Sequence, residues 1–261
     1  MATVVVVSAL TGADGSISLS DQIVIAGAEL GLVLWVSRTF LRRFEDKELD
    51  DIGFQLHGTK FWIGIVIGAA LQFFGFVVLW STHNVSVSFT AFNAANFIGY
   101  LALFGLVALH EEILIRGYIL SNFIQSYGKR LGLLSSALLF GFMHFQNPSF
   151  NILAFINISI AGILLGVSYL YDQNLSLPIG MHWSWNFVQG PVLGFAVSGQ
   201  GNASFIQIKN LGPVWITGGE FGFEGSVVCT VGMLISIGCV MVLYRRFWPG
   251  LRPPQASGRV W

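Results

Sequence analysis

Long runs of apolar residues without charge constrain this chain more than any other feature of its sequence. In hydrocarbon every backbone polar group must be bonded internally, so a run of about 20 apolar residues folds as a membrane-spanning helix. Charged residues make up only 10% of the chain, against roughly 25% in soluble domains. We therefore predict an all-α fold, a polytopic bundle with about seven transmembrane spans: Ile23–Leu41, Phe61–Trp80, Phe97–Ile124, Leu131–Phe145, Ile152–Tyr171, Leu175–Val197 and Val227–Tyr244.

The basic residues indicate how these spans are oriented, because Lys and Arg concentrate in cytoplasmic loops. When the spans are threaded alternately across the membrane, Lys209 alone of the 13 basic residues falls on one side. This distribution places the N-terminus outside and the C-terminus inside. The basic residues on the inner side are Arg38, Arg42, Arg43, Lys47, Lys60, Arg116, Lys129, Arg130, Arg245, Arg246, Arg252 and Arg259.

The remaining sequence adds little to this membrane bundle. We predict one transmembrane domain over residues 1–250, with the motifs described below in 97–197, and a short disordered tail over 251–261. The Gly-rich stretch Ser198–Ser226 is expected to be an external connecting loop. A net charge of zero gives no electrostatic basis for a nucleic-acid partner. The chain is expected in contact with membrane lipid as a multi-pass protein, in the plasma membrane if the organism is a prokaryote.

Ionisable residues inside the spans are the candidates for function, because each costs about 2.5–3.5 kcal/mol on insertion scales and needs a partner or a role. Glu29 stands alone in the first span, and we expect it to form a hydrogen bond at a helix interface. The others form three clusters, on the third, fourth and sixth spans: His110, Glu111, Glu112 and Arg116; His144; and His182 with Asn186.

The first cluster lies in the segment HEEILIRGY. Glu112 and Arg116 are four residues apart, so they share a helix face and can form an ion pair. Glu111 is turned about 100° away, which leaves its carboxylate available as a general base. The alternative is a helix-end ion pair at the membrane interface. If Glu111 and His144 belong to one site, they must lie at a similar depth in the bilayer. This requires the third helix to continue to about Tyr127, with Arg116 buried.

In each of the other two motifs, two residues lie on the same face of a helix, which is expected to face the interior of the bundle. Phe140 precedes His144 by one helical turn, and His182 precedes Asn186 by one turn. A single membrane histidine is more often a packed, hydrogen-bonded residue than a ligand. Three costly clusters on separate spans are better explained by one shared site.

Together these motifs resemble those of the CPBP family of intramembrane proteases, also called the Abi family, which includes the type II CAAX prenyl endopeptidases. The EExxxR motif of the family is similar to the segment from Glu111 to Arg116. Its FxxxH motif is similar to Phe140 and His144, and its HxxxN motif to His182 and Asn186. The resemblance covers about residues 97–197.

This resemblance implies an intramembrane endopeptidase that uses glutamate-activated water to hydrolyse a peptide bond in a membrane-associated or lipidated peptide. Glu111 is then the general base, and His144 helps to hold the water. His182 and Asn186 stabilise the oxyanion, while the ion pair of the EExxxR motif holds Glu111 in place. The two tryptophans beside His182 are expected to shape the substrate entrance.

These motifs leave metal dependence open. Leu114 stands where an HExxH zinc motif carries its second histidine, so that motif is absent. Zinc held by His144, His182 and a carboxylate agrees with the motifs, and so does catalysis without a metal. Two other classes of protein are alternatives: a non-catalytic immunity or scaffold protein of the same fold, and a proton-coupled transporter with Glu111 and the histidines as its relay.

Overall fold

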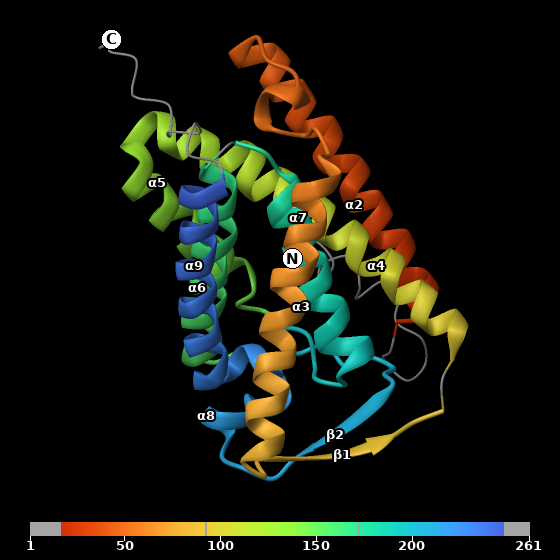
Figure 1. Cartoon of the computed structure of the whole chain (residues 1–261). Helices are drawn as coiled ribbons and strands as arrows, with labels where there is room; N and C mark the ends of the chain where they lie inside the picture. The colour runs from red at the N-terminus through yellow and green to blue at the C-terminus, as the bar shows by residue number, and fades with distance from the viewer. Residues whose placement is uncertain (1–16, 92, 172, 248–261) are drawn as a thin grey trace.

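A computed structural model describes residues 17–91, 93–171 and 173–247 of the chain. Helices make up most of this part, which confirms the all-α fold class (Figure 1). The predicted tail over 251–261 lies outside the described residues, as do Arg252 and Arg259. The helices are α2 (Leu19–Phe40), α3 (Gly58–Ser81), α4 (Ala94–Glu112), α5 (Ser121–Met143), α6 (Ile152–Leu170), α7 (Ser176–Phe187), α8 (Val214–Thr217) and α9 (Val227–Phe247), with π-helical segments at Leu41–Glu45, Ile113–Leu120 and Val188–Val192 and 3-10 helices at Leu49–Ile52, Gly219–Phe221 and Phe223–Gly225.

A helical run from Ala94 to Met143 carries the EExxxR motif and Phe140, and His144 follows directly after its last residue. The run bends at Gly128, whose φ of 77° and ψ of 168° are not helical. Glycine adopts a positive φ without the steric penalty of a Cβ atom. The bend separates the predicted third and fourth spans. The helix before the bend continues through Tyr127, as predicted from the shared depth of Glu111 and His144 in the bilayer. After the bend the chain returns along itself, so that Phe140 lies against Arg116 with 4.2 Å between the ring centroid and the guanidinium carbon.

Helices α3 and α7 pack closely because glycine lies at their contact. A Cβ atom on Gly68 would clash with the carbonyl oxygen of Met181, and one on Gly180 would clash with the carbonyl oxygen of Phe61. Small residues let helix backbones approach each other in this way in membranes. The contact holds α7, which carries the HxxxN motif, in the interior of the bundle.

Five helical runs are long and apolar enough to cross a membrane: Leu19–Glu45, Gly58–Ser81, Ala94–Met143, Ile152–Leu170 and Val227–Arg246. Their outer faces expose large apolar side chains, including Trp35 at 67% and Val66 at 66%. Such exposure is expected for an integral membrane protein, whose surface faces lipid. The predicted third and fourth spans share one run, and the predicted sixth span corresponds to the shorter α7 with its π-helical continuation. The count of seven crossings therefore stays a prediction.

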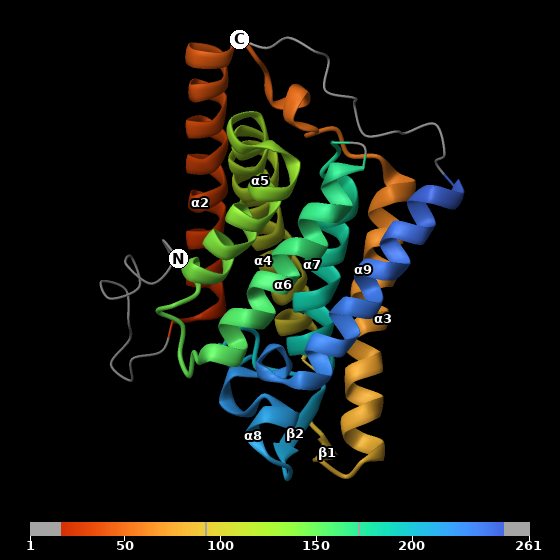
Figure 2. The same cartoon turned by 90° about the vertical axis from the view of Figure 1, so that its left-hand side faces the viewer.

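The two ends of the bundle differ in structure and in charge. Figures 1 and 2 both show a small sheet and α8 at one end, opposite the C-terminal ends of α2 and α9. The sheet pairs β1 (Val85–Phe89) with β2 (Ile206–Asn210) in antiparallel register. Only loops were expected here, although the alternation of apolar and polar residues in VSVSF is typical of a short strand. Lys209 lies in β2, away from the other described basic loops, and which end faces the cytoplasm stays a prediction.

Candidate active site

A buried ion pair lies behind the site. Nη1 of Arg116 donates a hydrogen bond of 2.8 Å to Oε1 of Glu112, and the two side chains are 1% and 0% exposed. The guanidinium also lies over the Phe140 ring, a favourable cation–π contact. The pair is therefore inside the bundle, and the alternative of a helix-end ion pair at the membrane interface is wrong.

His182 is held by the same carboxylate. Its Nδ1 lies 2.8 Å from Oε1 of Glu112. Because an ionised carboxylate only accepts hydrogen bonds, Nδ1 carries the proton and donates it. Nε2 of His182 is directed toward Glu111, 3.9 Å from Oε2. Glu112 thus fixes both the tautomer and the orientation of this ring.

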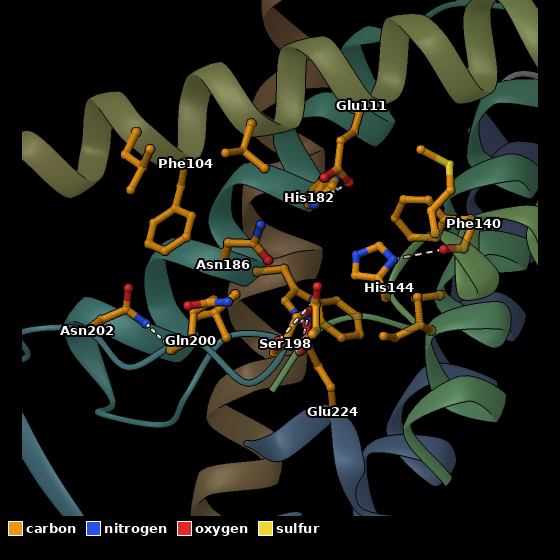
Figure 3. Close-up of a pocket in the computed structure, with 18 of the residues that line it drawn as sticks. Phe104, Glu111, Phe140, His144, His182, Asn186, Ser198, Gln200, Asn202 and Glu224 are labelled. Carbon is orange, nitrogen blue, oxygen red and sulfur yellow. Dashed lines mark hydrogen bonds and ion pairs between the residues drawn. The ribbon is translucent and has the colours of Figure 1, made fainter. Parts of the chain in front are cut away.

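Two further histidines follow the same pattern through main-chain carbonyl groups. Nδ1 of His144 lies 2.8 Å from the carbonyl oxygen of Phe140, and Nδ1 of His110 lies 3.1 Å from that of Leu106. A carbonyl oxygen only accepts, so both Nδ1 atoms donate and both Nε2 atoms keep a lone pair in the neutral ring. Figure 3 shows the second nitrogen of His144 facing the cavity. Nε2 of His110 lies 4.0 Å from Oε1 of Glu111.

The carboxylate of Glu111 therefore sits between two imidazoles, those of His110 and His182. Its side chain is 17% exposed, and Oε2 has no hydrogen-bond partner among the residues that the structure describes. Nε2 of His110 also lies 3.8 Å from Oε2 of Glu29, which comes from α2. Glu29 thus contributes to the site, in addition to the role at a helix interface expected for it. A carboxylate with an unused oxygen is suited to accept a proton from water.

These groups open onto a cavity of about 450 Å³ whose lining includes Glu111, His144, His182 and Asn186 (Figure 3). Asn186 is 6% exposed, and its side chain makes no hydrogen bond within the described part of the chain. Its amide is therefore available to a ligand. Four of the six predicted site residues thus share one cavity, while the other two form the ion pair behind His182.

A metal site requires several ligands around one point. Within the described ranges, no group of three or more His, Cys, Asp or Glu residues is arranged to hold a metal ion. Nε2 of His144 and Nε2 of His182 are suitable donors in chemistry, yet no carboxylate joins them in such a group. Zinc on these two histidines, one of the two alternatives that the motifs leave open, therefore lacks a third ligand among the described residues.

The end of the cavity opposite Glu111 contains residues that sequence reasoning missed. Ser198 and Glu224 both line the cavity, although they lie in the stretch expected to be an external connector. Oε2 of Glu224 accepts hydrogen bonds from the backbone N–H of Ser198 at 2.6 Å and from its Oγ at 2.8 Å. No sequence pattern marks a glutamate in a Gly-rich loop as buried. Only the tertiary fold brings it to the site.

The two tryptophans beside His182 have different surroundings. Trp185 lines the cavity and donates a hydrogen bond of 3.1 Å from Nε1 to Oε1 of Glu224. Trp183 instead donates to the carbonyl oxygen of Leu101 in α4, and its ring lies 5.5 Å from that of Phe61. It is not among the described lining residues. Only Trp185 is thus placed to contact a bound molecule.

Comparison with known proteins agrees with the motifs. Residues 93–188 match the family model of type II CAAX prenyl endopeptidase Rce1-like proteins. The matched segment contains all three motifs, from Glu111 to Asn186, and confirms the predicted resemblance to this protease family. No curated protein and no solved structure matches the chain.

Proposed function

We propose that this chain, a member of the family of type II CAAX prenyl endopeptidase Rce1-like proteins, is an intramembrane endopeptidase that hydrolyses a peptide bond in a membrane-associated or lipidated peptide. The observation that carries the proposal is the placement of Glu111. Its side chain lines the cavity, its two oxygens lie 4.0 Å and 3.9 Å from the imidazoles of His110 and His182, and Oε2 accepts no hydrogen bond from the described residues. This is the environment that a general base for water requires.

Activation of the water rests on two acceptors. The water donates one hydrogen to Glu111 and the other to the lone pair on Nε2 of His144. Glu111 takes its proton as the oxygen attacks the peptide carbonyl carbon, and an electron pair moves to the carbonyl oxygen. Enclosure by helices keeps the local dielectric low, which strengthens each of these interactions.

The oxyanion that forms needs hydrogen-bond donors. Asn186 supplies an NH₂ group, and its amide makes no competing hydrogen bond with the described residues. His182 uses its Nδ1–H for Glu112, so it can donate to the oxyanion only when Nε2 is protonated as well. Asn186 is therefore the donor assigned to the oxyanion in either protonation state of His182.

Collapse of the intermediate completes the reaction. Glu111 returns its proton to the leaving nitrogen, the C–N bond breaks, and a new carboxylic acid, which keeps the second hydrogen of the water, and a new amine are released. The carboxylate of Glu111 is then ionised again and ready for the next water. No other group has to gain or lose a proton over the cycle.

The test compares Glu111→Gln with the parent protein in membranes. Glutamine keeps the size of the side chain but cannot accept the proton, so cleavage should fall by at least roughly 100-fold, the lower limit for general-base catalysis. Peptide termini found by proteomics only with the parent protein would identify substrates. Glu220→Gln, an exposed position, is the matched control and should leave the termini unchanged. Unchanged cleavage by the Glu111→Gln protein would refute the proposal.

The alternative functions predict different results for the parent and variant proteins. A phenotype that survives Glu111→Gln would favour the non-catalytic immunity or scaffold protein. Proton-coupled uptake into proteoliposomes would favour the transporter. Zinc bound at one ion per chain and lost in His144→Ala would show that a metal takes part.

A further inference from the structure

The cavity carries negative charge at both ends. Its described lining includes the carboxylates of Glu29, Glu111 and Glu224, and no Lys or Arg. Arg116, which lies behind His182, already pairs with Glu112. The carboxylates of Glu111 and Glu224 therefore place negative charge on the described lining of the cavity, and low-dielectric walls strengthen its field.

Glu224 has no use in the proposed reaction, yet it is deeply buried. The residue is 7% exposed. Its described partners are the indole N–H of Trp185 and the backbone N–H and hydroxyl group of Ser198, all of them neutral donors. These hydrogen bonds hold the carboxylate group in place but do not neutralise its charge. A buried charge without an opposite partner is strongly unfavourable, so its retention calls for an explanation.

The surroundings of Glu224 are those of a binding subsite rather than of a closed core. Asn147, Gln200 and Asn202 also line this end of the cavity, and Asn147 donates to the carbonyl oxygen of Ser198 over 3.0 Å. Figure 3 shows Glu111 and Glu224 on opposite sides of the view, with Asn186 and His144 between them. Leu103, Phe104, Ile158 and Leu165 supply apolar walls.

Glu224 also has accepting capacity left. A carboxylate offers about four lone-pair sites, and the described donors occupy three of them. The remaining site, on Oε1, can accept a charge-assisted hydrogen bond from a cation in the cavity.

We propose that the Glu224 end of the cavity is a subsite for a positively charged group of the peptide substrate, with Glu224 as the residue that determines this preference. The inference rests on the proposed function, because it assumes that a peptide is the ligand. The apolar walls hold the aliphatic stem of a Lys or Arg side chain while its charged head reaches Oε1 of Glu224. A free α-amino group has the same charge and is the other possible source of the cation.

The test measures binding in the Glu111→Gln protein, so that cleavage does not interfere. Matched peptides carry Lys, norleucine or Glu at one position, which is moved along the sequence, and each has a free or an acetylated N-terminus. The Lys peptide should bind at least about tenfold more tightly than the norleucine peptide, and the Glu peptide should bind most weakly. Loss of the preference on acetylation alone would assign the cation to the N-terminus.

Variants then test whether the preference for the Lys peptide depends on Glu224. Adding Glu224→Gln should bring the ratio of the Lys and norleucine affinities close to one. Ser198→Ala, which removes a donor but keeps the charge, and the exposed control Glu220→Gln should both retain the ratio. An equal preference with and without Glu224→Gln would overturn the proposal. If Glu224→Gln fails to fold, equal affinities for the Lys and norleucine peptides in the parent background would overturn it as well.

The two proposals can fail separately. If the parent protein cleaves no peptide although the Lys preference depends on Glu224, the proposed function fails and the cation subsite stands. If the parent cleaves Lys and norleucine peptides equally well and binds them equally, the subsite fails and the endopeptidase stands.

Discussion

His182 and Arg116 donate hydrogen bonds to the same atom, Oε1 of Glu112, each over 2.8 Å. This shared oxygen joins the EExxxR motif on α4 to the HxxxN motif on α7. The tautomer of the imidazole in the cavity therefore depends on an ion pair outside the cavity. A change at Arg116 should affect the site through Glu112 even though Arg116 is not among the described lining residues.

Replacing Arg116 with Met should destabilise the protein by about 3–5 kcal/mol, because it leaves the Glu112 carboxylate buried without a cation. Thermal unfolding in detergent measures the loss. Arg42→Met is the matched control: Arg42 pairs with Glu48 on the surface, where both side chains are 53% exposed. Such a pair contributes only about 0–1 kcal/mol. Equal losses in the two variants would contradict the assigned role of the buried pair.

Replacing Asn186 with Ala should lower kcat by roughly 100- to 1,000-fold, the range for removal of one oxyanion donor. KM should change little, because the donor acts mainly on the transition state. Steady-state kinetics on any identified peptide provide the measurement. Asn210→Ala, at an exposed position in β2, is the control and should keep both constants. A rise in KM without a fall in kcat would show that Asn186 binds substrate instead.

His110 should act as a positioning residue for Glu111, since its Nε2 lies 4.0 Å from Oε1 of that carboxylate. His110→Asn is expected to lower kcat by less than roughly 100-fold, the smallest effect expected for direct proton transfer, with KM unchanged. His83→Asn, in the turn before β1, is the control and should be neutral. A loss as large as that of Glu111→Gln would instead place His110 among the groups that transfer protons.

Gly68→Ala should lower stability by about 1–3 kcal/mol, because the added methyl group would push α3 away from α7. The atoms in its way are the Met181 carbonyl oxygen and Oγ of Ser184. Gly31→Ala on α2, where a Cβ atom meets nothing within 4 Å, is the control. That control should be neutral or slightly stabilising, since Ala favours helix over Gly by up to about 1 kcal/mol. Equal melting temperatures for the two variants would show that the α3–α7 contact tolerates expansion.

Several features could be predicted from the sequence because they depend on local pattern. Apolar runs predicted the helices, and the four-residue spacing predicted the pair of Glu112 and Arg116. The requirement that Glu111 and His144 share a depth predicted a helix as far as Tyr127, and Gly128 ends it in the structure. The catalytic roles of these residues stay predictions.

Other features could not be predicted because they depend on contacts between distant segments. The burial of Glu224 follows from donors 26 and 39 residues away, at Ser198 and Trp185. The place of α7 in the interior follows from glycines on both helices, among them Gly68 and Gly180. No pattern within either segment indicates these partners.

The loop that carries Glu224 has a consequence for how such an enzyme can change. The groups assigned to bond cleavage lie on α4 and α7 and at the C-terminal end of α5, whereas Ser198, Gln200, Asn202 and Glu224 on the opposite wall come from a connecting segment. Under the proposed roles, reactivity and selectivity are encoded in separate stretches of the gene. Exchange of residues 198–226 between relatives would then change the substrate preference and leave the groups assigned to bond cleavage in place. This segment lies outside the helical runs that are long enough to cross a membrane.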